Sequence, residues 1–206
     1  MRQTTSLNGK FALVTGAGGG LGKQIALQLI AAGATVAALG RTPEKLEKLR
    51  EIHGKSVLPL IGDVGNPDDV RNAFQHIDEQ FGRLDILINN AGIYHPFLID
   101  EASDHQLQSI INTNLLGPAY CMREAVKRMK PNGGGDIVNV TSESARNPFP
   151  YLSMYAASKS GLEALSTAQR AELSAHDIRV IIFRSGSMTG DDANASAAEW
   201  LSLIHI

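Results

Sequence analysis

Tyr155 and Lys159 are the residues of this sequence whose types and spacing best fit a chemical step. They stand four positions apart in an amphipathic stretch, so on a helix both side chains would lie on one face. A lysine ammonium beside a phenol favours the phenolate and lowers the tyrosine pKa from about 10 toward neutrality. Tyr155 would then exchange a proton with a substrate oxygen. The same spacing also arises by chance on helices that have only a structural role.

Hydroxyl and amide side chains earlier in the chain could assist that step. Ser142 follows a short apolar run, and a hydroxyl there could hydrogen-bond a carbonyl oxygen as negative charge develops on it. Its neighbours Thr141 and Ser144 are alternatives that spacing alone does not exclude. Asn114 falls inside a predicted helix although asparagine is a poor helix former, which indicates a functional role, a cap or a kink.

A glycine-rich segment, TGAGGGLG at 15–22, stands between a β-branched run and a helical pattern. Glycines allow positive φ angles and a close approach to a ligand, and free N–H groups at a helix start attract a pyrophosphate. The spacing differs from the GxGxxG fingerprint of dinucleotide sites, and a tight structural turn is the alternative. The candidate cofactor-binding residues of this segment are Gly16, Gly18, Gly20, Leu21 and Gly22.

The second apolar run ends at Gly40 and is followed by Arg41 rather than by an acidic residue. A carboxylate at this turn would bind a ribose hydroxyl of NAD, whereas a guanidinium binds the additional 2′-phosphate of NADP. A solvated arginine at a helix start is the alternative. The sequence therefore favours NADP(H) as the cofactor, with NAD(H) as the second choice.

Two further strand ends carry residues suited to holding a cofactor. Asp63 and Val64 could contact the edge and the face of an adenine, and the small polar segment NNAG follows the fourth apolar run. Asn, Asp and Gly are also ordinary turn residues, so either segment alone is weak support. Tyr94 and His95, just past NNAG, could border a substrate. The cofactor candidates within NNAG are Asn90, Ala91 and Gly92.

Short apolar runs alternate with longer amphipathic stretches along the whole chain. This alternation predicts an α/β fold: a Rossmann-like, doubly wound parallel sheet of order 3-2-1-4-5-6, with helices on both faces and ligands at the carboxyl ends of the strands. We expect one domain over residues 1–206. The expected strands span 11–15, 35–39, 56–61, 85–89, 136–140 and 179–183. The expected helices span 21–32, 43–53, 67–81, 103–129 and 153–175.

Composition narrows the class of protein and its partners. Hydrophobic residues make up 43% of the chain and the formal net charge is −2, so nothing in its electrostatics indicates nucleic acid or an acidic membrane as a partner. No apolar run is long enough for a signal peptide or a membrane span, and the single cysteine, Cys121, forms no intrachain disulfide. The histidines show no metal-ligand spacing. We expect a cytoplasmic protein that binds a small molecule and no metal.

Taken in order, these motifs resemble those of the short-chain dehydrogenase/reductase family, in its compact subgroup, over residues 9–189. The resemblance implies an NADP(H)-dependent oxidoreductase that transfers hydride between the nicotinamide and a carbonyl or secondary alcohol. It implies that Tyr155 is the acid and base, and that Lys159 binds the nicotinamide ribose and lowers the tyrosine pKa. It further implies that Ser142 orients the substrate and that Asn114 positions a water linked to Lys159.

Two features depart from the family's pattern. The family usually has Pro-Gly after the sixth strand, where this chain has Ser185 and Gly186. Gly186 and Thr189 still fit as cofactor-binding residues, but we expect a looser loop beside the nicotinamide. The resemblance also implies a substrate-covering helix, another helix and a seventh strand, whereas this chain ends at Ile206 in a segment that resembles a translated sequencing adaptor. We therefore expect a truncated chain with weak or no activity and an exposed sixth strand.

The resemblance further implies a homodimer or homotetramer, with contacts through the helices at 103–129 and 153–175. Two other functions stay open. One is a non-catalytic nucleotide-binding sensor, or an inactive fragment of such an enzyme, and the other is a methyltransferase-like α/β protein. Both leave the Tyr155–Lys159 pair without a role. The identity of the substrate is beyond the sequence.

Overall fold

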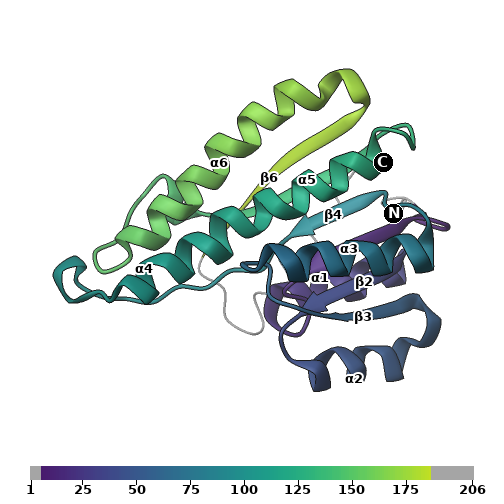
Figure 1. The fold of residues 1–206 in the computed structure, drawn as a ribbon, viewed down its shortest axis with the longest axis horizontal. Coiled ribbons are helices and arrows are strands. Elements are labelled where there is room, and N and C mark those ends of the chain that lie inside the picture. The colour runs from purple at the N-terminus through teal and green to yellow at the C-terminus, as the bar shows by residue number, and fades with distance from the viewer. Residues whose placement is uncertain (1–5, 187–206) are drawn as a thin grey trace, which may run out of the picture.

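A computed structural model describes residues 6–186. Within this part of the chain, six parallel strands form one sheet in the order β3-β2-β1-β4-β5-β6, with helices on both faces (Figure 1). The predicted doubly wound α/β fold is confirmed. The strands are β1 (Phe11–Thr15), β2 (Thr35–Gly40), β3 (Val57–Ile61), β4 (Ile86–Asn89), β5 (Gly135–Ser142) and β6 (Ile178–Ser185). The α-helices are α1 (Gly20–Ala31), α2 (Pro43–His53), α3 (Pro67–Phe81), α4 (Asp104–Ile111), α5 (Gly117–Met129) and α6 (Ser153–Leu173).

The strands are nearly continuous apolar runs because both faces of the sheet are buried. Successive side chains point to opposite faces, so Val14 packs into a cluster with α1 and α2, whereas Leu13 packs into a cluster with α3, α5 and the end of α6. The sheet is therefore held on both sides. Its strands and their carboxyl ends form a rigid platform for the loops that follow them.

Clear start and stop signals explain why α3 matches its predicted range. The side chain of Asn66 accepts a hydrogen bond from the N–H of Asp68, and Pro67 occupies the first turn. Gly82 ends the helix in the left-handed conformation, with a φ of 69°. Local signals of this kind fix helix ends without help from distant contacts.

The predicted helix over 103–129 is wrong in one respect, because it is not continuous. A π-helical segment, Asn112–Leu116, separates α4 from α5. Pro118 gives the physical reason: it has no N–H for the carbonyl of Asn114, and its ring clashes with that carbonyl. The chain accommodates the proline with one wider turn, a feature often found at functional sites. Asn114 therefore lies in an irregular turn rather than in a regular helix.

β6 is the outermost strand of the sheet formed by residues 6–186. It extends to Ser185, two residues beyond its predicted end, and Ser185 lies in register with Ser142 of β5. The residue that replaces the family's proline is thus part of the sheet. Residues 187–206, which include Thr189, lie outside the described residues.

Among the described residues, no helix is both long enough and apolar enough to cross a membrane. The same part of the chain contains no group of three His, Cys, Asp or Glu side chains placed to hold a metal ion.

Candidate active site

A pocket of about 110 Å³ opens at the carboxyl ends of the central strands. It is lined by the loop after β1, the turn after β2, the segment after β3 and the segment after β4. Strands of a parallel sheet end on the same side, which is why residues so distant in the sequence meet here. The pocket brings together six of the predicted cofactor-binding residues: Gly16, Arg41, Asp63, Val64, Ala91 and Gly92.

The glycine loop has the backbone geometry that its composition predicts. Gly16 and Gly20 have positive φ angles of 68° and 52°, which side-chain-bearing residues rarely adopt. A Cβ added at Gly22 would lie 2.3 Å from the carbonyl oxygen of Gly16 and 2.4 Å from Nδ2 of Asn90. Gly19 caps α1 without any side-chain hydrogen bond, so the amides of the first turn are available to an anion. This close-packed, amide-rich turn fits a cofactor pyrophosphate.

The other two predicted residues of this loop have packing roles as well. Leu21 is buried in the cluster beneath α1. A Cβ at Gly18 would come 3.4 Å from the Cβ of Lys45 on α2, which is ordinary contact. Gly16 and Gly22 are therefore the positions in this loop where the lack of a side chain matters most for packing.

Thr15 joins the glycine loop to the NNAG segment, a role that the sequence did not reveal. Its hydroxyl accepts hydrogen bonds of 3.0 Å from the backbone N–H groups of Asn90 and Ala91, and donates to the carbonyl of Ile88 at 3.2 Å. The side-chain amide of Asn90 donates back to the Thr15 carbonyl at 3.0 Å. The available signal was a single hydroxyl residue that closes an otherwise apolar strand.

Arg41 and Asp63 face each other across the pocket. Nη1 of Arg41 lies 3.6 Å from Oδ2 of Asp63, and both side chains are substantially exposed. The other carboxylate oxygen of Asp63 accepts from the N–H of Gly65 at 2.8 Å, which fixes the orientation of the side chain. An exposed pair of this kind contributes little energy, so Arg41 can exchange its partner for a phosphate.

A second cluster lies at the carboxyl end of β5, where Ser142 meets Tyr155 and Lys159 of α6. Ser142 is the last residue of β5, rather than a residue beyond it, and is hydrogen-bonded to Tyr155. Nζ of Lys159 lies 5.8 Å from the centre of the Tyr155 ring and donates to the carbonyl of Val140 at 2.9 Å. The hydroxyl of Thr141 instead donates to Glu163, which lies about two turns further along α6 than Tyr155. Of the candidate hydroxyls at 141 and 142, Ser142 is the one that meets the phenol.

Burial controls the acidities of this cluster. It raises the pKa of Tyr155 above its usual value, and the hydrogen bond from Ser142 offsets only part of that rise. Burial also lowers the pKa of Lys159 to about 8. The expectation that Lys159 lowers the tyrosine pKa is not met in the described chain, because an amine with a pKa of about 8 loses its proton before the phenol titrates. Desolvation, which favours both neutral forms, is the larger effect.

Asn114 holds the segment that follows β4 in place through side-chain hydrogen bonds to its backbone. It is fully buried, and its side chain accepts from the N–H of Ile93 and donates to the carbonyl of Ile93, each at 2.8 Å. Its amide also donates to Ser158 at 3.1 Å, and Ser158 donates to the carbonyl of Tyr155 at 2.7 Å. A Cβ on Gly92 would lie 3.4 Å from Nζ of Lys159. The structure thus places Asn114 and Gly92 against the cluster, and adds Ser158, a buried small residue inside the YAASK motif.

Tyr94 and His95 lie at the exposed side of the cluster. The ring of Tyr94 meets that of Tyr155 edge-on with centres 6.1 Å apart, while His95 is exposed. Gly186 is exposed at the end of β6, with nothing within 4 Å of an added Cβ.

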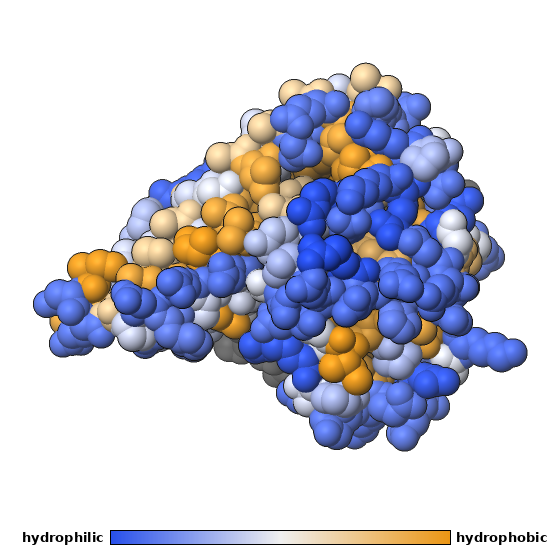
Figure 2. Space-filling view, viewed as in Figure 1, coloured by the Kyte–Doolittle hydropathy of each residue, from blue (hydrophilic) through white to orange (hydrophobic). Residues whose placement is uncertain are grey.

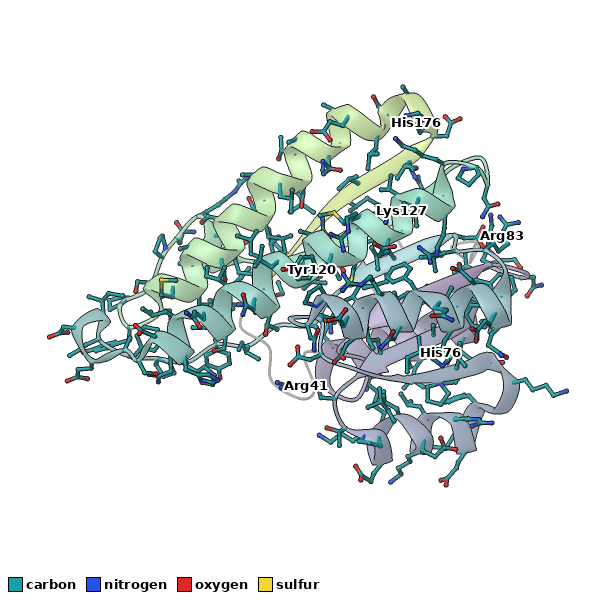
Figure 3. All side chains as sticks on the ribbon, viewed as in Figure 1. Arg41, His76, Arg83, Tyr120, Lys127 and His176 are labelled. Atoms are coloured by element: carbon teal, nitrogen blue, oxygen red, sulfur yellow. The ribbon has the colours of Figure 1, made fainter. Side chains whose placement is uncertain are left out.

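A larger pocket, of about 880 Å³, lies at the opposite end of the strands, near their amino ends. Arg83 lines it, and Figure 3 shows Arg83 at the far side of the molecule from Arg41. None of the predicted site residues contributes to this larger pocket. Because doubly wound sheets bind ligands at the carboxyl ends of their strands, the smaller pocket is the candidate site.

The lowered pKa of Lys159 predicts a pH-dependent cost in stability. Since an unfolded lysine has a pKa of about 10.4, the unfolded chain binds more protons than the folded chain between about pH 8 and pH 10. Relative to a Lys159→Met variant, the free energy of unfolding should therefore rise with pH in that interval, by up to about 3 kcal/mol. Urea titrations of both proteins at several pH values measure the difference, and parallel pH curves would contradict the prediction.

Comparison with known proteins agrees with this geometry. A family model described as short chain dehydrogenase matches residues 10–201. The short chain dehydrogenase/reductase AstE of Aspergillus oryzae is 36% identical over 204 residues, which cover 96% of this chain and 78% of that protein. A 3beta-hydroxysteroid dehydrogenase of Mediterraneibacter gnavus is 38% identical over 164 residues, which cover 77% of this chain and 59% of that protein.

Solved structures show the same likeness in three dimensions. The 3-ketoacyl-(acyl-carrier-protein) reductase of Brucella melitensis, crystallised as a complex with NADH, superimposes with a TM-score of 0.85 and 32% sequence identity. The match covers 88% of this chain and 76% of that one.

Proposed function

Because the chain belongs to the short-chain dehydrogenase/reductase family of NAD(P)-dependent oxidoreductases, we propose that it transfers hydride between NADP(H) and a carbonyl or secondary alcohol substrate. The observation that carries this proposal is the joint placement of Ser142, Tyr155 and Lys159 beside the glycine-lined pocket. A nucleotide-binding sensor would have no use for such a cluster.

The nicotinamide, when bound, supplies or accepts the hydride at its ring carbon, and the chain's own residues handle the proton. The hydroxyl of Ser142 orients the substrate carbonyl and donates a hydrogen bond to its oxygen as negative charge develops there. Oη of Tyr155 donates the proton to that oxygen in reduction, and accepts it in oxidation. Lys159 binds the nicotinamide ribose, and Asn114 positions a water that links Lys159 to solvent.

The adenosine half of the cofactor is assigned to the part of the pocket lined by the glycine loop, Arg41, Asp63 and Val64. Gly16, Gly18, Gly20 and Gly22 form the pyrophosphate turn, and Asp63 and Val64 flank the adenine. We assign the 2′-phosphate to Arg41, whose guanidinium lies at the pocket with only an exposed ion pair to give up. Gly186 and Thr189 are assigned to the nicotinamide end.

Arg41→Ala is expected to weaken NADPH binding by about 10- to 100-fold, while the Kd for NADH changes less than about twofold. The reason is that a charge-assisted, bidentate contact to the phosphate is lost and nothing that touches NADH is removed. Fluorescence titration with each dinucleotide measures the two constants. Arg50→Ala is the matched control, since Arg50 is an exposed arginine of α2 whose partner is Glu47. Equal weakening of both cofactors would refute the assignment of Arg41.

The surroundings of Tyr155 favour a substrate with an apolar body. Five of the seven exposed large hydrophobic side chains of the described residues lie in the loops after β4 and β5. The N–H of Phe97 donates to the carbonyl of Tyr151 at 3.0 Å and joins the two loops. The five are Tyr94, Leu98, Ile99, Phe149 and Tyr151.

A carbonyl panel tests the proposed activity directly. NADPH and NADH oxidation are followed with apolar ketones, ketoacyl thioesters and sugar carbonyls. We expect turnover with apolar carbonyls and NADPH. Binding of NADPH without turnover of any carbonyl would favour the sensor instead.

By the same family resemblance, we propose a single domain, a cytoplasmic location and a homodimer or homotetramer. Figure 2 shows hydrophobic side chains gathered over the region of α4, α5 and α6, which supports a subunit contact there. The hydride-transfer proposal does not depend on these assignments.

A further inference from the structure

Glu163 is a nearly buried carboxylate that none of the motifs accounts for. It lies on α6 one turn beyond Lys159, on the face that also carries Tyr155, and its side chain is only 15% exposed. Arg184 of β6 donates two hydrogen bonds to this carboxylate, from Nε to Oε1 at 2.5 Å and from Nη2 to Oε2 at 2.8 Å. A carboxylate held in this bidentate way has a fixed position and orientation.

Two further groups complete a cluster around this carboxylate. The hydroxyl of Thr141 on β5 donates to Oε1 at 3.0 Å, and Nε of Arg146, from the turn after β5, lies 3.7 Å from Oε2. We call Glu163, Arg184, Thr141 and Arg146 the α6 clamp. It ties together one helix, two strand ends and one turn.

Two members of the α6 clamp, Thr141 and Arg184, are next in sequence to a part of the proposed site. Thr141 precedes Ser142, and Arg184 precedes Ser185 and Gly186. Ser185 is itself held, because its hydroxyl donates to the carbonyl of Thr141 at 3.1 Å and its backbone lies in register with Ser142. The loop that was expected to be loose without its proline is thus anchored by side chains.

The ion pair at the centre of the clamp is charged at neutral pH. Burial by itself would raise the pKa of Glu163, but hydrogen bonds from Arg184 and Thr141, together with the charges of Arg184 and Arg146, hold that pKa below its usual value. Removing only the carboxylate would leave Arg184, which is 27% exposed, without its main partner. The strand end that Arg184 belongs to would then be free to shift.

We propose that Glu163 is a positioning residue that holds the end of β6 and the Ser185–Gly186 segment against α6, so that the nicotinamide half of the cofactor is seated beside Tyr155. This inference rests on the proposed function. The clamp joins β5, β6 and α6, whereas Arg41, Asp63 and the glycine loop are carried by β1, β2 and the segment after β3. Loss of the clamp should therefore affect one half of the cofactor and spare the other.

The chain offers a matched control at the opposite end of the same two strands. Arg179 of β6 donates from Nε to Oδ1 of Asp136 on β5 at 2.5 Å, and the Asp136 side chain is 7% exposed. Asp136→Asn therefore deprives an arginine of β6 of its buried carboxylate partner, as Glu163→Gln does. The difference is that Asp136 lies at the amino ends of the strands. A merely structural role for Glu163 would make the two variants behave alike.

The test measures Kd for two probes, NADPH and 2′-phospho-ADP-ribose, the second of which lacks the nicotinamide. We expect Glu163→Gln to weaken NADPH binding by about tenfold or more while the Kd for 2′-phospho-ADP-ribose stays within about twofold of the unmodified chain. Asp136→Asn should leave the ratio of the two constants unchanged, whatever it does to the melting temperature. Glu163→Asp, which keeps the charge, should restore part of the NADPH affinity.

If Glu163→Gln does not fold, the double variant Glu163→Gln/Arg184→Gln leaves no unpaired buried charge, and the same change in the ratio is expected of it. The positioning role would be overturned if the ratio of the NADPH Kd to the 2′-phospho-ADP-ribose Kd is unchanged in the variant that folds, whether or not both constants shift together. It would also be overturned if Asp136→Asn changes that ratio by the same factor. Failure of the unmodified chain to bind NADPH would instead count against the proposed function, which keeps the two failures distinct.

Discussion

Tyr155→Phe is expected to lower kcat by about 10³-fold while the Kd for NADPH stays within about twofold of the unmodified chain. The substitution removes only Oη, the atom from which the proton leaves. Because burial raises the pKa of Tyr155, the phenol is protonated at neutral pH and able to donate to a carbonyl oxygen in the direction of reduction. The contact of its ring with Tyr94 does not need the hydroxyl and should persist.

Steady-state kinetics with the best substrate of the carbonyl panel, together with NADPH titration, measure the two quantities. Tyr120→Phe is the matched control, since Tyr120 is a tyrosine of α5 whose ring packs against Arg123. That variant should turn over at the rate of the unmodified chain. A Tyr155→Phe enzyme that retains more than about a tenth of its kcat would show that the proton moves by another route.

Gly22→Ala is expected to abolish measurable NADPH binding, with a loss in affinity of about 100-fold or more. Its Cβ would lie 2.3 Å from the carbonyl oxygen of Gly16 and 2.4 Å from Nδ2 of Asn90, closer than any real contact. Neither group can withdraw freely, because one is backbone and the other is bonded to the carbonyl of Thr15. The glycine loop must therefore open, and with it the turn assigned to the pyrophosphate. Isothermal titration with NADPH measures the loss.

Gly19→Ala separates this steric effect from any general effect of adding a methyl group to the loop. Gly19 has an extended φ of −172°, and nothing lies within 4 Å of an added Cβ. As an N-cap substitution it should cost about 1 kcal/mol of stability or less and change the NADPH Kd by less than about threefold. A Gly22→Ala protein that binds NADPH as Gly19→Ala does would show that close packing at Gly22 is not needed for the cofactor.

These two expectations rest on different physical effects in two parts of the proposed site, the glycine loop and the cluster around Tyr155. Gly22 acts through excluded volume, so its substitution should remove cofactor binding and turnover together. Tyr155 acts through one proton, so its substitution should remove turnover alone. Measuring both binding and turnover for each variant therefore tests whether the pocket and the cluster belong to one site.

Local signals made much of this protein predictable from its sequence. The ranges of β1, α2 and α3 follow from apolar runs bounded by caps, prolines and glycines, and they match the prediction. The sheet order follows from strand–helix alternation, because right-handed crossovers leave few ways to arrange parallel strands. Helical periodicity alone placed Tyr155 and Lys159 on one face. Apart from the sheet order, each of these inferences uses only residues that are near neighbours in the chain.

The rest depended on contacts between distant segments, which no local pattern contains. Pro118 breaks the long predicted helix, but only the fold shows that the resulting turn aims Asn114 at Ile93 and Ser158. Which strand hydroxyl meets the phenol was undecidable until α6 was placed along β5, with Tyr155 at its start beside Ser142 and Glu163 two turns later beside Thr141. The acidity of Tyr155 follows the same logic, since the sequence showed a nearby amine but not the burial that outweighs it.

Periodicity and turn chemistry over a few residues set the class of fold and the residue types at the strand ends, so both could be read from the amino-acid sequence. How those strand ends are joined to one another depended on the folded chain. The Thr15 hydroxyl links the glycine loop to the NNAG segment by hydrogen bonds. The nearly buried carboxylate of Glu163 on α6 accepts hydrogen bonds from β5 and β6. Such bonds link residues far apart in the sequence, and their partners are settled by the packing of the whole sheet.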